Sequence, residues 1–146
     1  MDDVGRYLLV NQQVQAGQRF DALAQLFDPW TIRHIEGCGL APGDAVWEVG
    51  AGGPSLVTWL AERVGPTGRV VASDIDTSWL EEAEGHCYQV LRHDVATDDP
   101  PDGPFDLVHA RLVLVHVVER ERAIAAMVSV LRPGGWIVLE EADPAL

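Results

Sequence analysis

The chain has 146 residues, of which 47% are hydrophobic, and this is enough for one domain with a buried core but not for two. Its formal net charge of −13 disfavours nucleic acid and anionic membrane surfaces as partners, because an acidic surface repels both. No apolar run approaches the ~20 residues of a transmembrane helix, and the acidic start is unlike a signal peptide. Two cysteines, Cys38 and Cys87, without paired-motif spacing predict a cytoplasmic protein with reduced thiols.

The N-terminal segment carries a helical pattern. Apolar residues recur every three or four positions from residue 7 to about residue 37. Asp28-Pro29 predicts an interruption, because proline lacks the amide hydrogen that a helix interior needs, and a second helix is predicted over residues 31–38. We expect residues 1–41 to form a helical cap on the carboxyl ends of the strands, since so short a segment cannot bury a sufficient core alone.

The remaining residues, 42–146, alternate between strand and helix patterns and are expected to form the cofactor-binding core. Strands separated by helices imply a parallel sheet with right-handed crossovers and helices on both faces. This predicts an α/β fold, a doubly wound Rossmann-like parallel sheet of order 3-2-1-4-5, with a ligand at the carboxyl ends of the strands. The predicted strands cover residues 45–49, 69–73, 88–92, 105–110 and 136–140, and the predicted helices cover residues 55–64, 78–84, 112–117 and 120–131.

The first predicted strand runs into a glycine turn, Gly50-Ala51-Gly52, and the second ends on Asp74. Glycines let the backbone approach a ligand closely, and a carboxylate at that strand end can accept hydrogen bonds from both ribose hydroxyls. The pattern therefore predicts a cofactor that contains a nucleoside. For Asp74 the alternatives are a helix cap or a solvated turn. Asp76 competes for the ribose role but better fits a cap for the helix that follows.

Three details bear on which cofactor is meant. Glu48, at the end of the first strand, suits the sulfonium and ammonium groups of S-adenosylmethionine and would repel a pyrophosphate. Ser55 stands where the dinucleotide pattern G-x-G-x-x-G has its third glycine. No basic residue stands in the turn to meet a phosphate. S-adenosylmethionine is therefore favoured over a nicotinamide dinucleotide.

Five short motifs follow one another along the chain: Glu48-Val49-Gly50-Ala51-Gly52, Asp74-Ile75-Asp76, His93-Asp94-Val95, Phe105-Asp106-Leu107-Val108-His109-Ala110-Arg111 and Leu131-Arg132-Pro133-Gly134-Gly135. With these motifs, residues 15–141 resemble the class I S-adenosylmethionine-dependent methyltransferases, in particular their small-molecule branch. Pro54 departs from the family pattern, which has a third glycine there. Proline is acceptable in the first turn of a helix, so Pro54 indicates an altered helix start.

The resemblance implies S-adenosylmethionine as the cofactor and suggests which residues meet its adenine. Ile75 would lie against the adenine face. Asp94 would accept a hydrogen bond from the exocyclic amino group, and Val95 would supply an adjacent backbone amide. The alternative for Asp94 is one loop aspartate among several.

Other residues would meet the methionine portion. Glu48 would order the glycine turn or reach the methionine ammonium through water; alternatively it is a strand-end carboxylate paired with an arginine. Ala110 would offer its carbonyl to the ammonium. Arg111 is either a further ligand residue or a surface residue.

The sequence identifies no catalytic residue. Methyl transfer is an in-line displacement at an activated carbon, so the protein mainly aligns donor and acceptor and excludes water. His116, after the fourth strand, could remove a proton from a hydroxyl; the alternative is a structural histidine. The histidines lack the spacing of a zinc site, so no metal is expected. The five tryptophans are expected to pack on apolar faces.

The family resembled here continues after its fifth strand with a helix and an antiparallel strand pair, which this sequence lacks. We therefore expect the C-terminal antiparallel strands to be missing, and a homodimer through the exposed edge over residues 136–142. The leading hypothesis is a methyltransferase acting on a small-molecule acceptor. The alternative is an S-adenosylmethionine-binding module or a shortened methyltransferase without activity of its own, and a nicotinamide-dependent oxidoreductase is a third hypothesis.

Overall fold

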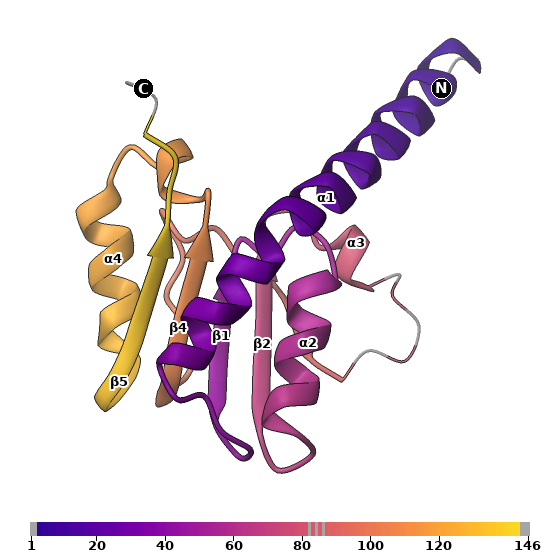
Figure 1. The fold of residues 1–146 in the computed structure, drawn as a ribbon. Coiled ribbons are helices and arrows are strands. Elements are labelled where there is room, and N and C mark those ends of the chain that lie inside the picture. Colours follow the sequence, from indigo (N-terminus) through magenta and orange to yellow (C-terminus); the bar gives the residue numbers. More distant parts are fainter. Residues whose placement is uncertain (1–2, 82, 84, 86, 144–146) are drawn as a thin grey trace.

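The computed structural model describes residues 3–81, 83, 85 and 87–143, and its five strands form one parallel sheet of order β3-β2-β1-β4-β5 (Figure 1). The predicted α/β fold and strand order are therefore confirmed. The strands are β1 (Ala45–Val49), β2 (Arg69–Asp74), β3 (Gln89–Arg92), β4 (Phe105–Arg111) and β5 (Leu131–Glu140). The helices are α1 (Asp3–Gly37), α2 (Ser55–Val64), α3 (Ser78–Glu81), the 3-10 turn η1 (Leu114–His116) and α4 (Arg120–Ser129).

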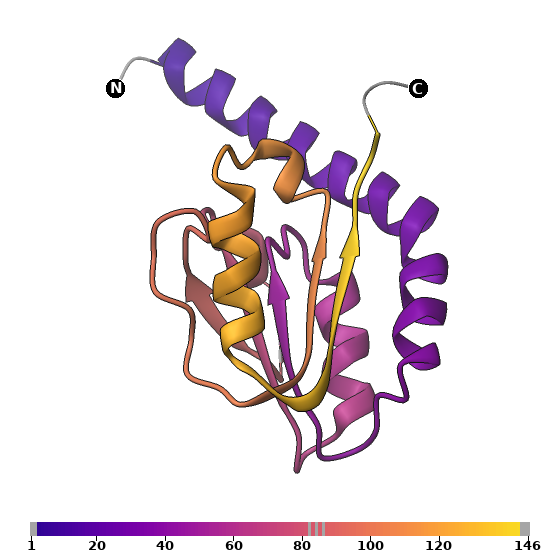
Figure 2. The same cartoon turned by 90° about the vertical axis from the view of Figure 1, so that its left-hand side faces the viewer.

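Neighbouring residues of each strand serve two different hydrophobic cores, because successive side chains point to opposite faces of a sheet. Val46 of β1 belongs to the core shared with α1 and α2, whereas Trp47 belongs to the core under α4. Figure 2 shows α4 on one face of the sheet and α1 with α2 on the other. Both faces are thus covered, as a parallel sheet requires.

The main departure from the sequence expectation is α1. It is one helix of 35 residues that continues through Pro29, so the predicted interruption and the separate second helix are wrong. The helix bends, and its N-terminal part projects from the body of the molecule (Figures 1 and 2). A proline inside a helix removes one hydrogen bond and commonly bends it. Tertiary contacts outweigh this loss, since Asp28 binds Ser55 and Arg111, and Ile35 is fully buried.

Smaller differences concern the ends of elements. The turn predicted over residues 132–135 lies inside β5, where the register with β4 shifts between Phe105 and Leu107. The helix predicted over residues 112–117 is only the single turn η1. The helix predicted over residues 78–84 corresponds to α3, which is described only as far as Glu81; residues 82 and 84 lie outside those that the structure describes.

Several apolar groups remain at the surface. Trp47 is fully buried, but Trp30 and Trp136 are 59% and 54% exposed, so the expectation that all five tryptophans pack in apolar surroundings is wrong for these two. β5 is an edge strand, and no described strand pairs with its outer side. Within the described part of the chain, no helix is both long and apolar enough to cross a membrane.

Candidate functional site

The turn between β1 and α2 is tightly enclosed. Gly50 and Gly52 have φ angles of 63° and 66°, in the left-handed region that favours glycine. A Cβ atom at Gly50 would lie 2.4 Å from Val113 Cγ2, and one at Gly52 would lie 2.8 Å from Phe20 Cε1. Phe20 therefore places α1 directly on the glycine turn. Pro54 immediately precedes the first residue of α2, as expected of an altered helix start.

Asp74, at the end of β2, organises the same turn. Its Oδ2 accepts a hydrogen bond from the Gly52 amide at 2.8 Å, and its Oδ1 accepts one from the Asp76 amide at 3.1 Å. Asp76 has a different role, because its Oδ1 accepts from the amide and hydroxyl of Ser78 at the start of α3. The hydroxyl hydrogen bond from Ser78 lowers the pKa of Asp76. This geometry fits the helix-cap interpretation of Asp76.

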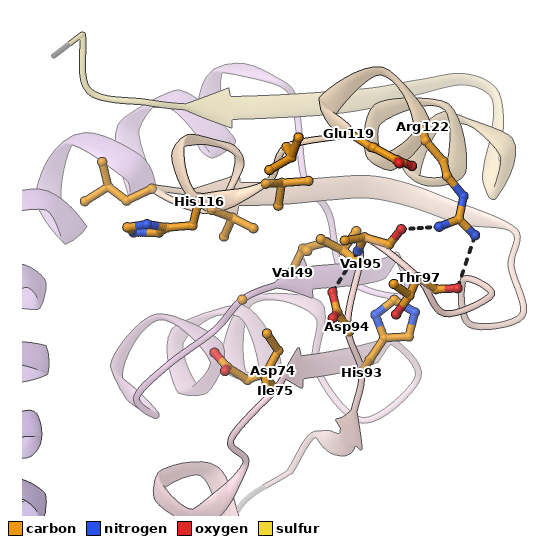
Figure 3. A pocket seen from close by; sticks show the side chains of 16 residues that line it. Val49, Asp74, Ile75, His93, Asp94, Val95, Thr97, His116, Glu119 and Arg122 are labelled. Carbon is orange, nitrogen blue, oxygen red and sulfur yellow. Dashed lines mark hydrogen bonds between the residues drawn. The ribbon is translucent and has the colours of Figure 1, made fainter.

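A cavity of about 700 Å³ opens beyond the ends of β1, β2 and β3 (Figure 3). Ile75, Asp94 and Val95 line it, which are the residues predicted to meet adenine. Asp94 Oδ1 accepts a hydrogen bond from the Ala96 amide at 2.9 Å, so the loop after β3 holds this carboxylate in place. Apolar side chains such as Val117 supply further lining, and a mainly apolar pocket with a few converging polar groups suits a purine.

A second cavity, of about 830 Å³, lies over the glycine turn and under α1. Glu48 and Arg111 line it, together with Gly50, Ala51 and Gly52 of the turn. The two cavities meet and form one groove at the carboxyl ends of the strands, where a doubly wound sheet binds its ligand. The residues that line both are Gly50, Asp74, Leu112 and His116.

The groove brings together nearly all the residues predicted to bind the cofactor. Ala110 alone among them lines neither cavity; it is fully buried and packs in the core under α4. The physical reason is that β4 continues to Arg111, so Ala110 lies inside the strand instead of just past its end. Arg111 is the first residue of this segment that reaches the groove.

Arg111 binds two residues of α1. Its Nη1 donates to Asp28 Oδ1 at 2.9 Å and to Thr31 Oγ1 at 3.0 Å. Ser55, the first residue of α2, donates its hydroxyl to the other oxygen of Asp28 at 2.6 Å. This ion pair fixes the bend of α1 beside the glycine turn, and Asp28 itself lines the second cavity.

His109, on β4, is fully buried between two carboxylates, an arrangement not predicted from the sequence. Its Nδ1 lies 2.6 Å from Glu48 Oε2, and its Nε2 lies 2.9 Å from Glu140 Oε2. Glu140 also accepts a hydrogen bond from the Thr31 hydroxyl at 2.6 Å and lies 2.7 Å from His34 Nδ1. The three residues on neighbouring strands thus connect the groove to α1.

The carboxylates determine the protonation of His109. Burial alone would lower the pKa of His109, but the charge of Glu48 and hydrogen bonds to both carboxylates raise it to about 9. Burial would raise the pKa of Glu140, but hydrogen bonds from His109, Thr31 and His34 lower it to about 2. Near neutral pH the protein therefore holds an imidazolium between two carboxylates.

One sequence signal for this cluster exists. Glu48 and His109 each interrupt an otherwise apolar strand, and they are direct partners in the register of β1 and β4. Ionisable residues are rare in central strands, because burying a charge is costly unless it is paired. Two of them at facing positions therefore suggest a buried pair. The signal becomes readable only when the strand register is known.

The segment after β4 also has an unusual backbone. Leu112 has a φ angle of 56°, rare for a residue other than glycine, and its amide donates to the Glu140 carbonyl at 2.8 Å. The amides of residues 113–115 approach the Glu141 carboxylate at 3.0 to 3.3 Å. Together these contacts fix η1, and His116 points into the first cavity (Figure 3) and also lines the second.

Comparison with known families shows to which family the chain belongs. The family described as "Methyltransferase domain" matches residues 47–139, from β1 through the glycine turn to the end region of β5. The chain belongs to the class I S-adenosylmethionine-dependent methyltransferases. The cofactor of this methyltransferase fold is S-adenosylmethionine, as predicted. The groove fits that cofactor, because close-approach glycines lie over one part and an apolar pocket with carboxylates forms the other.

Curated relatives are methyltransferases of quinone biosynthesis. The chain is 34% identical over 124 residues to the ubiquinone/menaquinone biosynthesis C-methyltransferase UbiE of Ectopseudomonas mendocina (strain ymp), covering 79% of the chain and 48% of the relative. It is 31% identical over 126 residues to UbiE of Francisella tularensis subsp. novicida (strain U112), covering 80% of the chain and 50% of the relative. This methyltransferase domain therefore spans about half the length of the curated relatives it matches.

Solved structures share the fold. An S-adenosylmethionine-dependent methyltransferase from Aquifex aeolicus superposes with a TM-score of 0.70 at 22% identity, covering 89% of this chain and 75% of that one. Coclaurine N-methyltransferase, solved with N-methylheliamine and S-adenosylhomocysteine, superposes with a TM-score of 0.65 at 18% identity, covering 85% and 35%. At these identities the likeness supports the fold of the methyltransferase domain and not a shared acceptor.

Proposed function

We propose that this chain binds S-adenosylmethionine along the groove and takes part in transferring its methyl group to a small-molecule acceptor. The observation that carries the proposal is the meeting of two cavities at Asp74, at the carboxyl ends of β1, β2 and β4. Adenine would lie with Ile75, Asp94 and Val95, and the ribose would meet Asp74. The methionine end would lie over the glycine turn, near Glu48.

The chain's own residues would act by positioning. The bound cofactor supplies a methyl group already activated by the sulfonium, so the protein must align the acceptor and exclude water. Phe20 and Trp79, whose rings contact edge-to-face with centroids 6.1 Å apart, line the second cavity and would exclude water over the turn. His116, at the junction of the cavities, is the residue best placed to accept a proton from an acceptor.

A small apolar or aromatic acceptor is the first to test. The relatives named above methylate carbon in ubiquinone and menaquinone biosynthesis, according to their names. The net charge of −13 disfavours a polyanionic acceptor such as nucleic acid.

The alternative proposal is a cofactor-binding module, or a shortened methyltransferase, that lacks turnover of its own. It is motivated by the coverage of about half of each relative and by the outer side of β5, with which no described strand pairs. Such a chain would bind the cofactor while another segment or subunit completed the acceptor site.

Calorimetry and a turnover assay distinguish these functions. Titrations with S-adenosylmethionine, S-adenosylhomocysteine and NAD should show binding of the first two and no comparable binding of NAD. Turnover with quinone-precursor phenols would support the methyltransferase, and binding without turnover across acceptors would support the module. Binding of NAD alone would overturn both and favour an oxidoreductase.

A further inference from the structure

Three ionisable residues on adjacent strands form a line from the groove to α1. Glu48 of β1 is 3% exposed and lines the second cavity, His109 of β4 is fully buried, and Glu140 of β5 is partly buried. Burying charged groups is costly unless they are paired and hydrogen-bonded. Here each ring nitrogen of His109 lies within 3 Å of one carboxylate oxygen, at 2.6 Å and 2.9 Å.

This geometry fits a doubly protonated ring between two ionised carboxylates. A neutral imidazole donates from one nitrogen only and would direct the lone pair of the other at a carboxylate. With both nitrogens facing carboxylate oxygens, only the imidazolium donates to both. The raised pKa of His109, about 9, agrees with that conclusion.

The groups around the ring favour its positive charge. Glu48 and Glu140 face the ring from β1 and β5. On α1, the Thr31 hydroxyl donates to the Glu140 oxygen that His109 contacts, and His34 meets the other Glu140 oxygen. Arg111 donates to the Thr31 oxygen and thereby joins its own ion pair with Asp28 to the cluster.

We propose that His109 is a positioning residue for methyl transfer, which as an imidazolium orients the Glu48 carboxylate in the cofactor groove and, through Glu140, holds α1 over that groove. The proposal rests on the proposed function, since it takes the groove to be the cofactor site. His109 uses only Oε2 of Glu48, and no described residue donates a hydrogen bond to Oε1. That oxygen is available to a cationic group of the ligand.

The position of α1 follows from the same contacts. The hydrogen bond from His109 helps to keep the partly buried Glu140 ionised. As a carboxylate, Glu140 accepts from Thr31 and meets His34. Phe20 belongs to the same helix, α1, and lies on Gly52 of the turn. Loss of the imidazolium would therefore alter two walls of the groove together, the Glu48 wall and the α1 wall.

The test begins with the unmodified protein. Nitrogen-15 NMR of the histidine rings at about pH 8 should show one ring with both nitrogens protonated, and its signal should disappear in His109→Gln. A neutral His109 ring at this pH would overturn the proposal without any variant having to fold.

The second arm measures S-adenosylhomocysteine affinity against pH by calorimetry. His109→Gln should weaken binding by about tenfold or more, by analogy with the loss of partners that orient metal-binding residues. The ligand's own amine titrates in both proteins, so the diagnostic quantity is the difference between the two profiles. That difference should be largest near neutral pH and should diminish as the pH rises through about 9. Unchanged affinity and profile in the variant would overturn the proposal.

Two further variants keep the test decisive. Glu140→Gln removes one charge from the far side of His109 and should shift the pH dependence to lower pH, which covers the case in which His109→Gln does not fold. Glu36→Gln is the control, because Glu36 is an exposed residue of the same helix, α1, and lines neither cavity. It should keep the wild-type profile. Wild-type protein that binds no S-adenosylhomocysteine would overturn the proposed function, whereas wild-type binding with an indifferent His109 variant would overturn this inference alone.

Discussion

The Gly52 amide donates a 2.8 Å hydrogen bond to Asp74 Oδ2, which joins the glycine turn to the end of the neighbouring strand β2. The same carboxylate uses its other oxygen to hold the Asp76 amide at 3.1 Å. Asp74 is thus oriented before any ligand arrives, which lowers the ordering cost of binding.

Replacing Asp74 by alanine should weaken S-adenosylhomocysteine binding by roughly 1.5–3 kcal/mol, the range for hydrogen bonds to a charged group. Calorimetry measures this directly. Glu62→Ala, at an exposed carboxylate of α2, serves as the control and should bind as the wild type does. Equal affinity of the Asp74 variant and the wild type would remove Asp74 from the site.

Gly52→Ala should lower both stability and cofactor affinity. The left-handed φ of 66° costs an alanine about 1–2 kcal/mol, and its Cβ would meet Phe20 Cε1 at 2.8 Å. Adding Phe20→Ala should relieve the contact but not the backbone strain, so the double variant should recover only part of the loss. Gly37→Ala, where a Cβ meets nothing within 4 Å, should show no loss in thermal unfolding.

Arg111→Ala should lower the free energy of unfolding by about 3 kcal/mol, because it leaves the nearly buried Asp28 carboxylate without its cation. The double variant with Asp28→Asn should recover part of this loss, since the uncompensated charge is then gone. Urea denaturation of the single and double variants gives the coupling between the two residues. Arg33→Ala, at an exposed arginine of α1, should change stability by less than about 0.5 kcal/mol. An additive cycle would mean that the pair contributes nothing.

Stability should depend on pH through His109 in a definite direction. Because its pKa is raised from 6.5 to about 9 in the folded protein, its stabilising effect is complete below pH 6.5 and is lost as the pH rises through about 9. Glu140 behaves oppositely: its pKa is lowered from 4.5 to about 2, so its stabilising effect is lost as the pH falls from 4.5 toward 2. The difference in unfolding free energy between wild type and His109→Gln should therefore shrink between neutral and alkaline pH. A difference that grew with pH would contradict a charged His109.

The homodimer through β5 remains a prediction, which the exposed edge makes testable. Light scattering at micromolar concentration should show association, because an unpaired strand edge offers its amides and carbonyls to a second chain. Val138 packs against the core shared with α1 and α2, so the better probe is the exposed Trp136. Trp136→Lys should weaken association, whereas Val128→Lys, at an exposed apolar residue of α4, should not. A monodisperse wild-type monomer would show that the edge is not an interface.

The strands and the groove could be predicted because their signals are local. Apolar runs ending at glycines or at Asp74 mark strand ends, and parallel strands bring those ends to one edge of the sheet. The course of α1 could not be predicted, since the proline rule describes an isolated helix and takes no account of Asp28 binding Arg111 across 83 residues.

The buried cluster was hidden for a related reason. His34 and Glu140 are separated by 106 residues, and no periodicity within either segment indicates their contact. His109 reads as one more residue of an apolar strand until the register sets it opposite Glu48. Ala110 shows that an error of one residue in a predicted strand end changes the role of a residue. The predicted strand ends at residue 110, but β4 continues to Arg111, so Ala110 lies in the core under α4 and does not line the groove.

Two consecutive acids, Glu140 at the end of β5 and Glu141 immediately after it, make separate contacts. Glu140 binds His109 and α1, while Glu141 accepts the amides of residues 113–115. Successive side chains leave a strand in opposite directions, so a slip of β5 by a single residue against β4 would send each acid to the wrong side. Both α1 and the loop that contains η1 would then lose these contacts at the groove. The alignment of these two strands is thus a condition for the shape of the groove, although β5 itself contributes none of the residues that line it.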